Sequence, residues 1–218
     1  MVYLKSITQT AICNTILLKE HWSLAPAQCT SMRSDPNMAN YISYWRIKYK
    51  FDENYIHSDI KRTVTHSRFN RGDYENNIGL FEHAEPIEAE YYVAPNNVEL
   101  SDEVFQKYSK EIFILKWKVD FSKKGDISET VVNPVSPINY SMCSTYATPV
   151  VETLRSYEFC VTFARENIRN TLDHGAVLVM DTKAIGFYSW GDTSGRGVPF
   201  VILNILHYKQ WFENIIYS

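Results

Sequence analysis

The sequence lacks a long hydrophobic run. None of its 218 residues falls in a segment of about 18 consecutive apolar residues, the minimum for a membrane-spanning helix, so we expect no membrane span. Residues 1–8 also lack the charged start and the apolar stretch of a signal peptide. Two alternatives follow: a leader lies outside this chain, or the protein stays in the cytosol.

The sequence has no excess of one charge and no metal-binding spacing. Lys and Arg number 22 and Asp and Glu number 25, a net charge of -3. Nucleic acids and anionic membranes need a clustered basic surface, so we expect neither as a partner. HxH, HExxH and CxxC spacings do not occur, and we expect no metal and no cofactor.

Short alternating apolar segments dominate what is present. They are separated by polar turns, a pattern typical of an all-β sandwich or barrel. The clearest examples are residues 11–18, 41–47 and 112–117. Only the tail follows a helical period, with apolar residues at i, i+3, i+4, i+7 and i+8: Tyr208, Trp211, Phe212, Ile215 and Ile216. We therefore predict strands throughout and one C-terminal helix.

Two motifs near the C-terminus carry the most specific signal. Asp173-His174-Gly175 forms a tight turn before an apolar segment, and Ser189-Trp190-Gly191 ends the segment after the next turn. Residues 22–29, ending in Cys29, and the pair Asn77-Ile78 complete the pattern. Together they resemble the trypsin/chymotrypsin-like serine protease family, and the resemblance runs from Tyr3 to Tyr217.

The resemblance implies a single domain of two packed six-stranded antiparallel β-barrels with a C-terminal α-helix. The N-terminal barrel would cover residues 1–85 and the C-terminal barrel residues 111–206. The polar stretch at residues 86–110 would connect them, and residues 207–218 would form the helix.

In the resembled family, three residues cut the peptide bond: a histidine base, an aspartate that orients it and a serine nucleophile. The corresponding positions here hold Gln28, Asn77 and His174. A carboxamide does not take up a proton near neutral pH, and an imidazole has no hydroxyl for an acyl-enzyme. The resemblance therefore implies a catalytically inactive homologue, or pseudoprotease, in which we expect Gln28 to be a polar residue on a surface turn.

The surroundings of these positions also differ from the family. Leu172 takes the place of the oxyanion-hole glycine, and Ile168 takes the place of the aspartate at the base of the trypsin specificity pocket. Asp173 remains, but the 12 residues before Cys13 are too few for the family's activated N-terminus. We expect a loose, zymogen-like pocket.

The four cysteines match two family disulfides. The resemblance implies the pairs Cys13–Cys29 and Cys143–Cys160, which favour a secreted protein in an oxidising compartment. The alternative is four reduced thiols in an intracellular protein.

Several features could bind a partner. Arg71-Gly72-Asp73 occurs in a polar loop, where integrins could read it in a secreted protein, and Asn139 begins the sequence's N-glycosylation sequon. Ile168, Ser189, Trp190 and Gly191 would line the former substrate cleft, whose edge strand pairs with extended peptides in proteases.

The sequence therefore predicts a non-catalytic module that binds another protein, as cofactor, adaptor or decoy for a protease cascade or an extracellular partner. Such homologues are common in insects. One alternative is an intracellular interaction scaffold derived from a protease fold. The other is an enzyme with relocated activity centred on His174, assisted by Asp173 and by nearby histidines: His21, His66 and His83.

Overall fold

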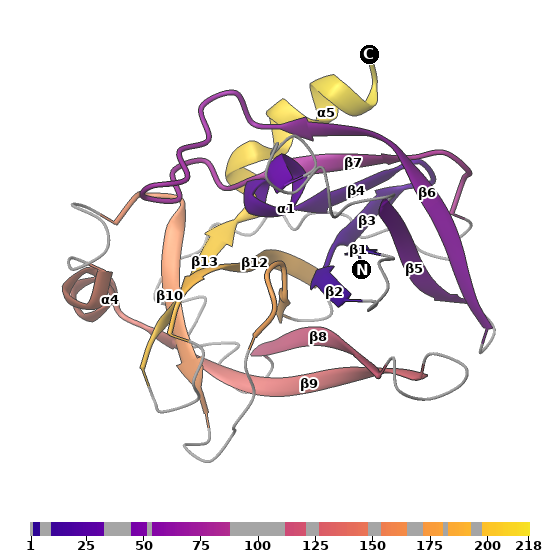
Figure 1. Ribbon diagram of the computed structural model, residues 1–218. Helices are drawn as coiled ribbons and strands as arrows, with labels where there is room; N and C mark the ends of the chain where they lie inside the picture. The colour runs from indigo at the N-terminus through magenta and orange to yellow at the C-terminus, as the bar shows by residue number, and fades with distance from the viewer. Residues whose placement is uncertain are drawn as a thin grey trace.

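The computed structural model describes residues 2–4, 10–32, 45–51, 54–87, 112–120, 127–147, 154–164, 172–180, 183–192 and 198–218. Strands dominate and separate into two halves, as Figure 1 shows. The all-β, trypsin-like class expected from the sequence is confirmed.

The N-terminal half is a seven-stranded sheet in the order β2-β1-β5-β6-β7-β4-β3. Its strands are β1 (Val2–Leu4), β2 (Thr10–Cys13), β3 (Ile16–Lys19), β4 (Trp22–Ala25), β5 (Trp45–Phe51), β6 (Asn54–Thr65) and β7 (Gly79–His83). This differs from the six-stranded barrel expected here, because β1 pairs with β5 and adds β2 as a further strand. Strand β4 pairs with β3 and β7 and is buried along its whole length, with Trp22 and Leu24 packed in the cluster that includes Phe212 of the C-terminal helix.

The C-terminal half is the closed six-stranded barrel that the sequence predicts, in the order β10-β13-β12-β11-β8-β9. Its strands are β8 (Ile112–Asp120), β9 (Ile127–Ile138), β10 (Glu158–Phe163), β11 (Val177–Met180), β12 (Lys183–Gly191) and β13 (Phe200–Asn204). The barrel interior is apolar and includes the fully buried side chains of Ile114, Leu178 and Phe200. Burial of this surface stabilises the barrel by about 25 cal/mol per Å².

The C-terminal helix is confirmed and joins the two halves. A 3₁₀ turn, η1 (Ile205–Tyr208), leads into α5 (Lys209–Ile216). Tyr208 and Phe212 are buried in a cluster with Ile16, Trp22 and Leu24 of the N-terminal sheet. In Figure 1, α5 accordingly lies at the top of the view, beside β6 and β7.

Two short helices were not predicted, α1 (Ala27–Met32) and α4 (Tyr140–Ala147). The six residues of α1 make fewer than two turns, and α4 buries only Cys143 and Ala147, so neither helix has the continuous apolar stripe that identifies α5. Each is fixed covalently instead. Cys29 of α1 is bonded to Cys13 of β2, and Cys143 of α4 to Cys160 of β10, so both expected disulfides are confirmed.

Strand β7 ends at His83 and β8 begins at Ile112. The proposed connection between the halves lies mostly outside the described residues, which stop at 87 and resume at 112. Among the helices that are described, none has the length and apolar character needed to cross a membrane.

Candidate functional site

A cavity of about 390 Å³ draws its lining from both halves of the molecule. Gln28 and Tyr74 belong to the N-terminal half, and His174, Trp190 and Gly191 to the C-terminal half. Three tyrosines and a tryptophan make most of the described lining apolar: Tyr74, Tyr146, Tyr188 and Trp190. A cavity of this size, apolar with a few polar groups, is typical of a ligand site.

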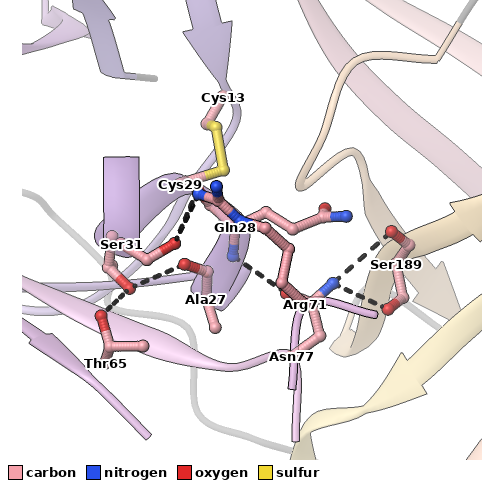
Figure 2. The surroundings of a disulfide bond; sticks show 10 residues. Cys13, Ala27, Gln28, Cys29, Ser31, Thr65, Arg71, Asn77 and Ser189 are labelled. Atoms are coloured by element: carbon pink, nitrogen blue, oxygen red, sulfur yellow. Dashed lines mark hydrogen bonds between the residues drawn. A yellow bond between two sulfur atoms is a disulfide. The ribbon is translucent and has the colours of Figure 1, made fainter. Parts of the chain in front are cut away.

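Gln28 lies inside the molecule rather than on a surface turn, which corrects the expectation from the sequence. It is the second residue of α1 and is only 9% exposed. The neighbouring Cys29 is bonded to Cys13 and fully buried, and this holds the start of α1 against the sheet. Figure 2 shows the Gln28 carboxamide extending from the helix toward the side on which Ser189 lies.

Asn77 connects Gln28 to the C-terminal half. Its Oδ1 accepts a hydrogen bond of 3.0 Å from the backbone N–H of Gln28, and its Nδ2 donates one of 2.9 Å to Ser189 Oγ. Figure 2 shows both bonds. Asn77 and Ser189 are fully buried, so these bonds lie in a low-dielectric interior where an unpaired polar group is costly.

His174 occupies the turn before β11. The turn is tied to β2 by a bridge from Cys13 and by a 2.8 Å hydrogen bond from the backbone N–H of Asn14 to the His174 carbonyl. Gly175 follows with φ of +79°, and a Cβ there would overlap the Asn14 carbonyl oxygen, so only glycine fits. Burial lowers the pKa of His174, and the imidazole is therefore neutral at neutral pH.

Gln28, Asn77 and His174 thus come together, as the sequence predicts. Gln28 and His174 line the same cavity, and Asn77 bonds directly to Gln28. Leu172 is 7% exposed and belongs to the barrel core. Ile168 lies outside the described residues.

Aromatic rings fill the barrel interior next to His174, which the sequence alone does not indicate. The His174 ring stacks on Tyr188 at 6.1 Å between centroids, Tyr188 meets Phe200 edge-on at 5.9 Å, and Phe200 packs on Phe163 at 5.2 Å. Tyr188 also donates a hydrogen bond of 3.0 Å to the Gly191 carbonyl. Tyr188 lies opposite Ile202 and Phe200 opposite Gly191 in the β12–β13 register, so the ring contact is diagonal and no sequence spacing indicates it.

Trp190 forms a wall of the cavity and is held from two sides. Its ring stacks with Tyr74, with centroids 6.2 Å apart and planes 14° from parallel. Its Nε1 donates a 3.2 Å hydrogen bond to Oε1 of Glu158, a buried carboxylate whose pKa burial raises. Gly191 next to it is exposed and has φ of +124°. Glu158 was not recognised in the sequence.

The Arg71-Gly72-Asp73 loop is joined to the same wall. Asp73 Oδ2 pairs with Arg155 at 2.7 Å, and Arg155 also contacts Glu158 at 3.5 Å. The Asp73 carboxylate, 36% exposed, is therefore paired within the chain. Tyr74, which follows, has φ of +60°, a costly conformation for a bulky residue that is typical of functional sites.

His21, His66 and His83, which the alternative of a relocated activity places near His174, have other contacts in the structure. The His66 ring packs on Tyr208 and Trp211. His83 is fully buried with Nδ1 at 3.3 Å from the Glu20 carbonyl, and His21 Nδ1 lies 3.1 Å from the His83 carbonyl. Within the described ranges, no three His, Cys, Asp or Glu side chains gather in a metal-binding cluster.

Asn139 is exposed at the start of α4, as a glycosylation site requires. Its Oδ1 accepts a hydrogen bond of 2.9 Å from the backbone N–H of Met142. The asparagine therefore caps the helix through Oδ1.

Comparisons with known proteins agree with this architecture. The family model described as "Trypsin" matches residues 1–212. The chain is 22% identical over 208 residues to a trypsin of the insect Phaedon cochleariae, covering 92% of this chain and 77% of the relative. It is also 22% identical to mannan-binding lectin serine protease 1 of Mus musculus, over 93% of this chain but 31% of that longer protein.

A solved structure has the same fold. Neuropsin, a serine protease expressed in the limbic system of mouse brain, superposes with a TM-score of 0.70 over 94% of this chain and 89% of its own. The sequences are 15% identical.

Proposed function

Because the chain belongs to the trypsin family, we propose that it is a non-catalytic member that binds a protein segment in its cleft and leaves it uncut. One observation carries the proposal. Gln28 and Asn77, bonded to each other at the cleft, offer carboxamides where proteolysis needs a base and the carboxylate that orients it. A carboxamide neither accepts the nucleophile's proton nor returns it to the leaving amine.

Within the described lining of the cavity, we find no nucleophile that is hydrogen-bonded to a base. The Ser189 hydroxyl is the cleft's serine, but it is fully buried and receives its hydrogen bond from Asn77, a neutral amide. The four cysteines are consumed in disulfides. His174 is neutral and stacks on Tyr188, so among described contacts it meets a ring rather than a hydroxyl or thiol that it could deprotonate.

The cleft keeps the features that hold a peptide. Strand β12 ends in the exposed Gly191 beside the cavity, where an extended segment could add as a further strand. Tyr74, Tyr146 and Trp190 supply the rigid aromatic surface that enriches interfaces. The partner in this proposal is therefore another protein, for which this chain serves as cofactor, adaptor or decoy. The two disulfides favour a secreted setting.

Binding without cleavage can be measured directly. The protein is incubated with a mixed peptide library, the retained peptides are recovered by size exclusion, and their masses are determined. We expect retained peptides of unchanged mass. Shortened peptides would refute the proposal, and so would retention that is equal for wild type and the cavity variant Tyr146→Ala. Tyr217→Ala, which removes a 67% exposed tyrosine of the C-terminus, is the matched control.

A further inference from the structure

Two buried polar atoms at the cavity lack a hydrogen-bond partner in the described chain. They are Oε1 of Gln28 and Nδ1 of His174. Both residues line the same cavity, and they come from different halves of the molecule. Buried polar atoms are nearly always paired, and leaving one unpaired destabilises the protein. Two of them beside one cavity indicate a site that is completed by a ligand.

Both residues are held by their backbones, which leaves the side chains available. The Gln28 N–H is fixed by Asn77 at 3.0 Å, and the His174 carbonyl by Asn14 at 2.8 Å. Neither bond uses the carboxamide of Gln28 or a ring nitrogen of His174. The fold therefore fixes the backbones that carry these two polar groups, and the stacking of His174 on Tyr188 orients its ring.

Gln28 Oε1 and His174 Nδ1 together favour an uncharged ligand that carries hydrogen-bond donors and a hydrogen-bond acceptor. Gln28 Oε1 accepts a hydrogen bond, and His174 Nδ1 accepts or donates according to the tautomer. A carboxylate has no donor for Gln28. An ammonium would lose its hydration on entering the cavity. Asp192, the charged residue of the described lining, is exposed to solvent and does not supply a buried counter-ion.

We propose that the cavity binds the primary carboxamide of an asparagine or glutamine side chain in the partner segment, held non-covalently by Gln28 and His174. A carboxamide donates to Gln28 and either accepts from or donates to His174. Tyr74 and Trp190, whose rings stack on each other, line the same cavity and surround the ligand with apolar surface. This inference rests on the proposed function and specifies what the cleft selects.

Three small probes with the same ring and different polar groups test the selection: phenylacetamide, phenylacetate and phenethylamine. Each is titrated into the ¹⁵N-labelled protein at pH 7.5, and shifts of the tryptophan and backbone amide signals give the affinity. We expect phenylacetamide to bind about tenfold more tightly than the other two, because it donates to Gln28 as phenylacetate does not and carries no charge to be dehydrated, as phenethylamine does. Gln28→Met and His174→Phe should each lose most of that tenfold preference.

Thermal unfolding without any ligand tests whether Gln28 and His174 serve ligand binding or stabilise the fold. Gln28→Met and His174→Phe remove unpaired buried atoms, so their Tm should equal or exceed that of wild type. Thr162→Val is the matched control, because Thr162 Oγ1 is also unpaired but lies on β10, outside the cavity lining. It should also keep or raise Tm while leaving phenylacetamide binding unchanged.

Several results would overturn the inference. Equal binding of the three probes would mean a cleft without carboxamide selectivity, and the proposed function would stand. A lower Tm for Gln28→Met would mean that ordered water or protein pairs Gln28 structurally. A separate assay uses an ester that is not one of the three probes, the acetate ester of phenol. Its hydrolysis by the wild type would refute the proposed function, whatever the order of the probe affinities.

Discussion

Asn77 and Ser189 lie 112 residues apart in the chain and are joined by a buried hydrogen bond of 2.9 Å between Nδ2 and Oγ. The same Asn77 side chain accepts from the Gln28 N–H. One carboxamide therefore fixes the start of α1 to β12 and sets the relative position of the two halves at the cleft.

The first prediction concerns this connection. Asn77→Leu leaves the Gln28 N–H without its acceptor in a buried site, so we expect a loss of about 2–3 kcal/mol in the free energy of unfolding. Urea denaturation followed by tryptophan fluorescence measures it. A loss below about 0.5 kcal/mol would show that the two halves are held together independently of Asn77.

The aromatic filling of the barrel gives a second prediction. Phe200 is fully buried between Phe163 and Tyr188, so Phe200→Ala should cost about 3–5 kcal/mol through lost burial and a residual cavity. The exposed Tyr217→Ala should stay within about 0.5 kcal/mol of wild type. Similar values for the two variants in urea denaturation would contradict the packing described here.

Arg155 forms ion pairs with Asp73 and with Glu158, next to Trp190. The two carboxylates differ in exposure, so substitutions that break the two pairs should lower stability by different amounts. Arg155→Met deprives the buried Glu158 of its cation and should cost about 3 kcal/mol. Asp73→Asn removes a partner that is 36% exposed and should cost about 1 kcal/mol or less. Chemical denaturation of the two variants at pH 7 tests the order, and a larger loss for Asp73→Asn would reverse it.

Stability should fall in acid because of His83. Burial lowers the pKa of His83 to about 4 from 6.5. Between these values the unfolded chain binds the proton and the folded chain does not, so stability is fully present above pH 6.5. It decreases as the pH falls to 4, by about 3 kcal/mol in total. The lowered pKa of His174 acts in the same direction, whereas the raised pKa of Glu158 opposes it.

Unfolding free energies measured from pH 7.5 to pH 4 test this dependence. His83→Gln, which cannot be protonated, should remove most of the slope. An unchanged slope in this variant would assign the acid sensitivity to other groups.

The strands, both disulfides and the C-terminal helix could be predicted from the sequence. Alternation and the spacing of Tyr208, Phe212 and Ile215 are local signals, and the cysteine pairs came with the family resemblance. The burial of Gln28 could not be predicted, because it depends on how α1 packs beside the Cys13–Cys29 bond. The contacts of Trp190 with Tyr74 and Glu158 join residues more than 30 positions apart. No local pattern encodes them.

We propose that this trypsin-family chain does not form an acyl-enzyme. Intact-mass spectrometry after incubation with an excess of a fluorophosphonate, with an active trypsin treated in parallel, tests it most directly. We predict an unchanged mass for this protein and complete labelling of the trypsin. A stoichiometric phosphonate adduct on this protein would contradict the account.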